Sequence, residues 1–269
     1  MNNVIHYINK SNKNLINIID DSITYSVLKN IMQYNCNDIY TNNESIIICY
    51  SNPPYPIWVW CKDISNKEDI LSISNILIKE YISKGKCNFI ISEYLLNELI
   101  KVNDIFKKLI HKMELLSYKL EEINNINYKC DGYMRKATMK DVDYLTLINK
   151  DAHYEMEGFT FSLDECKNKV IDLINHDNLY VWCNDNHEIV ATTNVLVDGI
   201  YSKISLVYTV PSYRRKGYAI NLVYSVSKIL LDNKLIPILY TDGGYKASNE
   251  CYKKIGYRQI GKLINIEIQ

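Results

Sequence analysis

Two adjacent arginines lie in a short basic segment whose composition suits an anion. Residues 214–219 read Arg-Arg-Lys-Gly-Tyr-Ala, between an apolar stretch that ends at Pro211 and an apolar helical pattern. The first turn of a helix has unpaired N–H groups and the positive end of the helix dipole, and Gly217 leaves the backbone open to a ligand. The two standard glycine-rich nucleotide-binding patterns are absent. The segment therefore predicts a pyrophosphate site, with a solvated basic turn as the alternative.

A second informative segment, residues 236–257, follows the expected helix of residues 218–232. It predicts a strand, a loop, a short helix, and then a glycine followed by an aromatic residue. The short helix would carry Ser248, Asn249 and Tyr252 on its first turns. A tyrosine hydroxyl in such a place has the chemistry of a general acid.

The elements that must position these segments form an α/β pattern. Thr138 with Asp141 predicts one helix start, and Ser162 predicts another. In the second half we expect helices up to about residue 154 and from 162 to 175, and strands at 179–183, 189–197, 204–210, 236–241, 257–263 and 264–269. In the first half we expect strands at 45–50, 56–61 and 87–91, and helices at 67–84 and 93–109.

The polar, Asn-rich stretch of residues 121–131 is the best domain boundary, and it follows an apolar pattern that we interpret as helical. One short echo joins the two halves: Pro-Ile-Trp-Val-Trp-Cys at 56–61 and Leu-Tyr-Val-Trp-Cys at 179–183. It leaves a duplicated fold as an open alternative.

With both segments present in this order, the sequence resembles the GNAT superfamily of acyl-CoA-dependent N-acyltransferases. The matching patterns are Arg-x-x-Gly-x-Ala at 214–219 and Ser-Asn-x-x-Tyr-x-Lys-x-Gly-aromatic at 248–257. The resemblance implies the GNAT acyl-CoA N-acyltransferase fold, an α/β (α+β) fold with a mixed, mostly antiparallel sheet and flanking helices. Residues 131–269 would form the N-acetyltransferase domain. Residues 1–125 lack the Arg-x-x-Gly-x-Gly/Ala loop and would form a degenerate GNAT-like half.

The resemblance also implies site residues for acetyl-CoA as co-substrate. Tyr252 would be catalytic and protonate the departing thiolate, and Asn249 would contact the pantetheine arm. The strand before the loop would pair with that arm, and an N–H at its end, with Val210 as the candidate, would donate to the thioester carbonyl oxygen. The remaining cofactor-binding residues are those of this strand and loop: Tyr208, Thr209, Arg214, Arg215, Lys216, Gly217, Tyr218 and Ala219.

The proton acceptor for the attacking amine stays open among Asp242, Glu155, Glu157 and water. The expected activity is direct transfer of an acetyl group to a primary amine of a small molecule or peptide. The alternatives are a longer-chain acyl-CoA donor and a non-enzymatic acyl-CoA-binding sensor. Tyr245 stands where related sequences often have an asparagine, which leaves the acceptor contacts open.

The overall composition restricts the partners. The chain has 269 residues, with 31 Lys+Arg against 31 Asp+Glu, which disfavours a nucleic-acid binder with a broad basic face. The 47% hydrophobic content excludes a wholly disordered chain. The eight cysteines form no Cys-x-x-Cys pair or zinc-ligand spacing, so we expect reduced, structural thiols and no metal. Without a secretory signal or a membrane-spanning run, we expect a cytoplasmic monomer or homodimer with no membrane partner.

Overall fold

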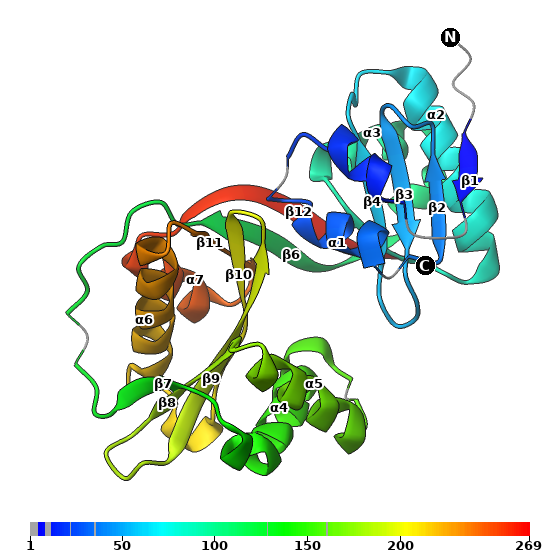
Figure 1. Ribbon diagram of the computed structural model, residues 1–269. Helices are drawn as coiled ribbons and strands as arrows, with labels where there is room; N and C mark the ends of the chain where they lie inside the picture. The colour runs from blue at the N-terminus through cyan, green and yellow to red at the C-terminus, as the bar shows by residue number, and fades with distance from the viewer. Residues whose placement is uncertain (1–4, 9–11, 22, 35, 128, 160) are drawn as a thin grey trace. The chain divides into compact units, whose positions relative to one another are not determined.

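The computed structural model describes residues 5–8, 12–21, 23–34, 36–127, 129–159 and 161–269 (Figure 1). The chain forms two compact units. Unit 1 comprises Met1–Ser117, Thr241–Tyr245 and Ile260–Gln269, and unit 2 comprises Tyr118–Tyr240 and Lys246–Gln259.

Unit 1 is a sheet with helices on both faces. The helices and strands of the first half are β1 (His6–Ile8), the 3-10 helix η1 (Lys13–Ile18), α1 (Ser26–Tyr34), β2 (Asp38–Thr41), β3 (Ile46–Tyr50), β4 (Ile57–Cys61), α2 (Lys67–Ile76), β5 (Asn88–Ile91), α3 (Glu93–Val102) and β6 (Leu109–Lys119). The strand order is β1-β2-β3-β4-β5-β12, where β12 spans Arg258–Ile268. Strands β4 and β5 run parallel, and the pairs β1–β2, β2–β3, β3–β4 and β5–β12 are antiparallel.

Alternation along β3 divides the core of unit 1 into two layers, as expected for a strand buried on both faces. Ile46 and Ile48 pack with residues of α2 and α3. Ile47 and Cys49 pack on the other face, in a cluster with Leu28 of α1. The sheet is therefore covered on both sides by apolar helix faces.

Unit 2 has the same layered construction. Its elements are β7 (Tyr133–Lys136), α4 (Val142–Glu157), α5 (Leu163–Asn175), β8 (Leu179–Cys183), β9 (Ile189–Asp198), β10 (Tyr201–Thr209), α6 (Tyr218–Asp232), β11 (Ile236–Asp242, which ends in unit 1) and α7 (Lys246–Ile255). The strand order is β7-β8-β9-β10-β11, with β10 and β11 parallel and the other neighbours antiparallel. Figure 1 shows α6 on one face of this sheet and α4 and α5 on the other.

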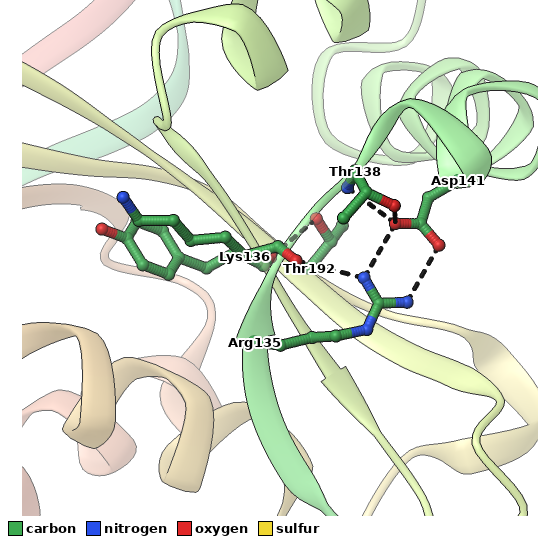
Figure 2. Close-up of polar contacts among 6 residues, drawn as sticks. Arg135, Lys136, Thr138, Asp141 and Thr192 are labelled. Carbon is green, nitrogen blue, oxygen red and sulfur yellow. Dashed lines mark hydrogen bonds and ion pairs between the residues drawn. The ribbon is translucent and has the colours of Figure 1, made fainter.

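Polar caps set the starts of the helices on the α4–α5 face. The carboxylate of Asp141 accepts hydrogen bonds from the backbone N–H and the hydroxyl of Thr138, at 2.7 and 2.8 Å. The Nη1 and Nη2 groups of Arg135 donate to the same carboxylate at 2.8 and 2.9 Å (Figure 2). Ser162 and Glu165 form a second capping box at the start of α5. Both predicted helix starts are confirmed.

The two halves of the chain repeat one order of elements. Each has a strand, two helices, three strands, a helix, a strand, a helix and a last strand. In this order β4–α2–β5 corresponds to β10–α6–β11, and both are parallel strand pairs joined by a helix. The segment 56–61 is therefore the counterpart of β10 rather than of 179–183, and the short sequence echo does not mark equivalent strands.

The last strand of each half, β6 and β12, is divided between the two compact units. β12, from the second half, pairs with β5 of unit 1 through Ile264–Glu267. The end of β6 belongs to unit 2, where the N–H of Leu120 donates to the carbonyl of Pro237 at 2.9 Å. The division into residues 1–125 and 131–269 stays a prediction about the halves of the chain, whereas unit 1 also includes residues 241–245 and 260–269 of the second half.

Three predictions about elements are wrong. Residues 257–263 and 264–269 were expected as two strands, but they form the single strand β12, because no turn interrupts the extended chain at residue 263. The helix expected at 93–109 ends at Val102, since Asn103 is extended and caps a following 3-10 turn. The apolar pattern before residue 121 is then a strand, β6, rather than a helix. The remaining pattern confirms the expected α/β fold with a mostly antiparallel sheet.

Candidate functional site

Strand β10 is irregular before it reaches the basic segment. Its register with β9 shifts between Ser205 and Tyr208, so one extra β10 residue lies in this stretch, and Leu206 has a φ of +50°. On the other side, β10 pairs with β11 only through Tyr201–Ile204, and no later β10 residue has a partner on β11 within the described residues. A bulge of this kind leaves backbone groups outside the ladder.

The basic segment of residues 214–219, called the anion loop below, leads into the start of α6. Arg215 and Gly217 have left-handed φ values of +63° and +88°. A Cβ at Gly217 would meet nothing closer than 3.6 Å, so the glycine is favoured by backbone conformation rather than by space. Gly217 is the N-cap, and no side chain of the described residues caps this end. The first N–H groups of α6, beginning at Tyr218 and Ala219, are therefore available to an anion.

Arg214 connects the loop to two other elements. Its Nε donates to the carbonyl of Thr209 at 3.0 Å, and its Nη2 lies 2.6 Å from Oε2 of Glu155 near the end of α4. Its guanidinium also lies 5.4 Å from the centre of the Tyr208 ring. Three residues predicted for the cofactor site, Tyr208, Thr209 and Arg214, are thus in direct contact.

The backbone N–H of Val210 is already in use. It donates to the carbonyl of Val190 at 3.0 Å, which continues the pairing of β10 with β9. The N–H that was predicted to donate to a thioester carbonyl is therefore part of the β9–β10 pairing in this structure. The unpaired bulge preceding it is a better source of donors.

The other side of the loop is fixed by Tyr218. Its hydroxyl donates to Oδ1 of Asp131 at 2.5 Å, which raises the pKa of Tyr218 to about 12 and lowers the pKa of Asp131. The carbonyl of Asp131 in turn accepts from Nε1 of Trp182 at 2.9 Å. Lys216 lies 5.1 Å from the centre of the Tyr213 ring. From the sequence, Asp131 was expected only at the domain boundary, and no local pattern indicated that it pairs with Tyr218.

The two predicted residues of α7 lie together in a buried aromatic group. Asn249 accepts a hydrogen bond from the hydroxyl of Tyr118 at 3.2 Å, and the ring of Tyr118 lies 6.3 Å from that of Tyr252. The ring of Tyr257 lies 6.0 Å from that of Tyr252, and its hydroxyl shares a hydrogen bond with Ser227. Burial raises the pKa of Tyr252, so its hydroxyl keeps its proton at neutral pH.

Gly256, the glycine of the pattern at residues 248–257, is required by its backbone conformation and by close packing. Gly256 has a φ of +116°, and a Cβ there would lie 2.6 Å from the carbonyl oxygen of Glu122. Any larger residue would push away the chain segment that packs against the end of α7. The motif glycine therefore serves packing rather than ligand contact.

The candidate bases have different surroundings. Glu155 is paired with Arg214, as described above. Asp242 lies in unit 1, where its Oδ1 accepts from the N–H of Gly244 at 2.8 Å, and Tyr245 nearby is exposed. The side chain of Glu157 lies outside the described part of the structure. No group of three His, Cys, Asp or Glu side chains suited to a metal is present among the described residues.

In unit 1 the helix that corresponds to α6 is α2, and its first turn is capped and acidic. The side chain of Asn66 caps α2 by accepting from the N–H groups of Glu68 and Asp69, at 3.1 and 3.4 Å. Both capped residues are acidic. Because this helix end has a side-chain cap and a negative charge, it does not suit a phosphate.

A small cavity lies under the bulge of β10. Its volume is about 10 Å³, which is room for about one water molecule. Leu206 and Thr192 line it from the sheet, and Leu145 and Asn149 line it from α4.

Within the described chain, none of the helices has the length and apolar composition needed to cross a bilayer.

Comparisons with known proteins agree with this architecture. Residues 185–265, which contain both motifs, match the family described as FR47-like protein. No curated protein matches the chain. Among solved structures, the chain is similar to a GNAT-family acetyltransferase from Colwellia psychrerythraea, with a TM-score of 0.66 and 14% identity over 99% of this chain and 100% of that one. It is also similar to a GCN5-related N-acetyltransferase from Sphaerobacter thermophilus, with a TM-score of 0.71 and 11% identity over 98% and 96% of the two chains.

Identities this low establish the fold alone, but the two structures cover nearly the whole chain, including both units. The FR47-like match is independent of them and falls on the segment that carries the anion loop and α7. The resemblance inferred from the sequence is thus confirmed, and the chain has the fold of the GNAT acetyltransferases, with its FR47-like segment at residues 185–265.

Proposed function

We propose that this protein is an N-acetyltransferase that uses acetyl-CoA and carries its site on unit 2. The observation that carries the proposal is the start of α6, which has no side-chain cap, begins at a left-handed glycine and is flanked by Arg214, Arg215 and Lys216. A pyrophosphate is the anion that this combination of N–H groups, helix dipole and positive charge suits. The acidic, capped start of α2 makes unit 1 the non-binding half.

The bulged end of β10 is the proposed place of the pantetheine arm and the thioester. Tyr208 and Thr209 lie beyond the last residue that pairs with β11, so their strand has an edge open to another chain-like ligand. With the N–H of Val210 occupied, we assign the donor to the thioester carbonyl oxygen to the bulge at Leu206 and Val207.

Transfer then needs one proton removed and one supplied. An unprotonated amine attacks the thioester carbonyl carbon, the oxyanion accepts a hydrogen bond from the bulge, and the carbon–sulfur bond breaks as the amide forms. Tyr252 is the proposed donor of a proton to the departing sulfur, since a phenol is protonated at neutral pH and can act as a general acid. Asn249, on the same helix, is the proposed contact for the arm. Of the predicted proton acceptors, Glu157 and water remain for a site on unit 2, since Asp242 belongs to unit 1.

The acceptor is proposed to be a primary amine of a small molecule or peptide, and the donor an acetyl thioester. A cytoplasmic location stays a prediction of the sequence.

Two measurements on the full chain test the proposal. Isothermal titration with acetyl-CoA should show binding, and a panel of amines with thiol detection should show release of CoA for at least one acceptor. Absence of binding at millimolar acetyl-CoA would overturn the proposal. Tight binding without thiol release across the panel would instead support an acyl-CoA-binding sensor, and preference for longer thioesters would replace acetyl as the acyl group.

A further inference from the structure

Two cysteines of unit 1 lie in direct contact. The Sγ atoms of Cys36 and Cys49 are 3.2 Å apart, although 12 residues separate them in the chain. Cys36 lies between α1 and β2, and Cys49 lies in β3. The contact forms because β2 and β3 are antiparallel neighbours, with Ile39 opposite Cys49. The sequence spacing alone carries no signal of such a pair.

The surroundings favour reaction between these two sulfurs. Both residues are buried, but Cys36 keeps 7% of its surface exposed and Cys49 none, so Cys36 is the more accessible of the two. The hydrogen bond between the thiols lowers the pKa of Cys36 and raises the pKa of Cys49. Cys36 is therefore the first of the two to ionise, and the thiolate is the reactive form of cysteine.

In contrast to Cys36, three other cysteines have raised thiol pKa values. Burial raises the pKa of the Cys61 and Cys251 thiols to about 12, and that of Cys130 to about 11. These thiols keep their protons at neutral pH and are poor nucleophiles. Cys61 also lies in unit 1 and donates to the carbonyl of Asp63. It therefore provides a matched control for the pair.

We propose that Cys36 and Cys49 are an oxidative modification site, which forms a reversible disulfide when the protein meets a small peroxide. The Cys36 thiolate attacks a peroxide oxygen, the O–O bond breaks, and Cys36 becomes a sulfenic acid with release of hydroxide or water. The Cys49 sulfur then attacks the sulfenic sulfur, the S–S bond forms, and water leaves. Two thiols are oxidised by two electrons in total, and one hydrogen peroxide is reduced to two waters.

The geometry requires little movement. The sulfurs must approach from 3.2 Å to a bond of about 2.05 Å, a decrease of about 1.2 Å. The bond would close a short loop that contains β2, and would tie the segment after α1 to the centre of the sheet. Because a cross-link restricts the unfolded chain, the oxidised protein should melt at a higher temperature than the reduced protein.

The test uses the reduced full chain treated with hydrogen peroxide. We expect loss of two thiols, a mass decrease of about 2 Da, and full reversal by dithiothreitol. Cleavage after Glu44 separates Cys36 from a fragment that holds both Cys49 and Cys61. The two fragments should stay linked without reductant, and they should also do so in Cys61→Ser, which assigns the link to Cys49. Trp58, the strand neighbour of Cys49, gives a second signal, since its fluorescence should fall on oxidation and recover on reduction.

Several results would overturn the proposal. Loss of the link in Cys61→Ser would show that Cys61, and not Cys49, is the partner of Cys36. Oxygen addition to Cys36 without a link would exclude the attack of Cys49 on the sulfenic acid. Retention of all thiols would exclude the site altogether. Cys36→Ser and Cys49→Ser should each abolish the link, and the fragment map of the unmodified chain decides the question if either variant fails to fold.

Discussion

The carboxylate of Glu155 lies 2.6 Å from the guanidinium of Arg214, so the end of α4 is joined to the anion loop by an ion pair. Both side chains are partly exposed, at 47% and 39%, which makes the pair weak in solution. Glu155 therefore neutralises part of the positive charge that the loop offers to a phosphate. This contact favours a role in tuning the loop over a role as the catalytic base.

Glu155→Gln should bind acetyl-CoA about two- to fivefold more tightly, because Arg214 keeps its charge without a competing carboxylate. Turnover should stay within about twofold of the original protein. The measurements are titration calorimetry and the pH profile of kcat. Asp143→Asn is the matched control, since Asp143 lies on α4 like Glu155 and its substitution removes an ion pair with Lys167 of α5. A fall in kcat of about a hundredfold or more would return Glu155 to the role of base.

Gly217→Ala should weaken acetyl-CoA binding by about tenfold and reduce the stability of the fold by about 1 kcal/mol, because alanine is strained at a φ of +88°. Gly199→Ala introduces comparable backbone strain at a φ of +58° in open space, away from the anion loop. The control should lose stability and keep affinity. Equal affinity loss in both variants would show that the loop has no particular part in binding.

The chain should bind one acetyl-CoA. The helix start of α2 is capped by Asn66 and carries Glu68 and Asp69, whereas that of α6 has no side-chain cap among the described residues. Titration calorimetry should therefore give a stoichiometry of one per chain. A stoichiometry of two would mean that the cap of α2 opens for a ligand.

Tyr252→Phe should lower kcat by about 10²- to 10³-fold while the dissociation constant for acetyl-CoA stays unchanged, since only the proton donor is removed. Tyr257→Phe is the matched control in the same aromatic group. Its hydroxyl bonds Ser227 in the interior, so its loss should reduce stability and leave kcat nearly unchanged. Unchanged turnover in Tyr252→Phe would remove this residue from the mechanism.

Asp141→Asn should destabilise the protein by about 1 to 2 kcal/mol at neutral pH, because it breaks the pair with Arg135 and weakens the cap at Thr138. These contacts hold the pKa of Asp141 at about 2, below the value of about 3.9 in an unfolded chain. The contribution of Asp141 is therefore complete above about pH 4 and is lost as the pH falls toward 2.

Urea unfolding at several pH values gives the comparison. The difference between Asp141→Asn and the original protein should shrink as the solution is acidified below pH 4 or so. Asp143→Asn removes only an exposed pair and should change stability by at most about 0.5 kcal/mol. A difference that is constant with pH would show that the ionised form of Asp141 contributes nothing.

The sequence by itself determined the local features. The capping boxes at Thr138 and Ser162 and the helix that opens at Gly217 depend on residues only a few positions apart, and the structure shows them as expected. The order of strands and helices in the second half was readable for the same reason. The errors at 93–109 and 257–269 arose where an apolar stretch of a strand has no local mark that separates it from a helix or divides it.

Tertiary structure alone decided the contacts between distant residues. The pairing of Arg214 with Glu155 spans 59 positions, and that of Tyr218 with Asp131 spans 87. The pairing of β12 with β5 and the sulfur contact of Cys36 with Cys49 likewise depend on which strands become neighbours in a sheet. Strand pairing is settled by the joint burial of apolar faces from the whole unit, so no short segment of the chain encodes it.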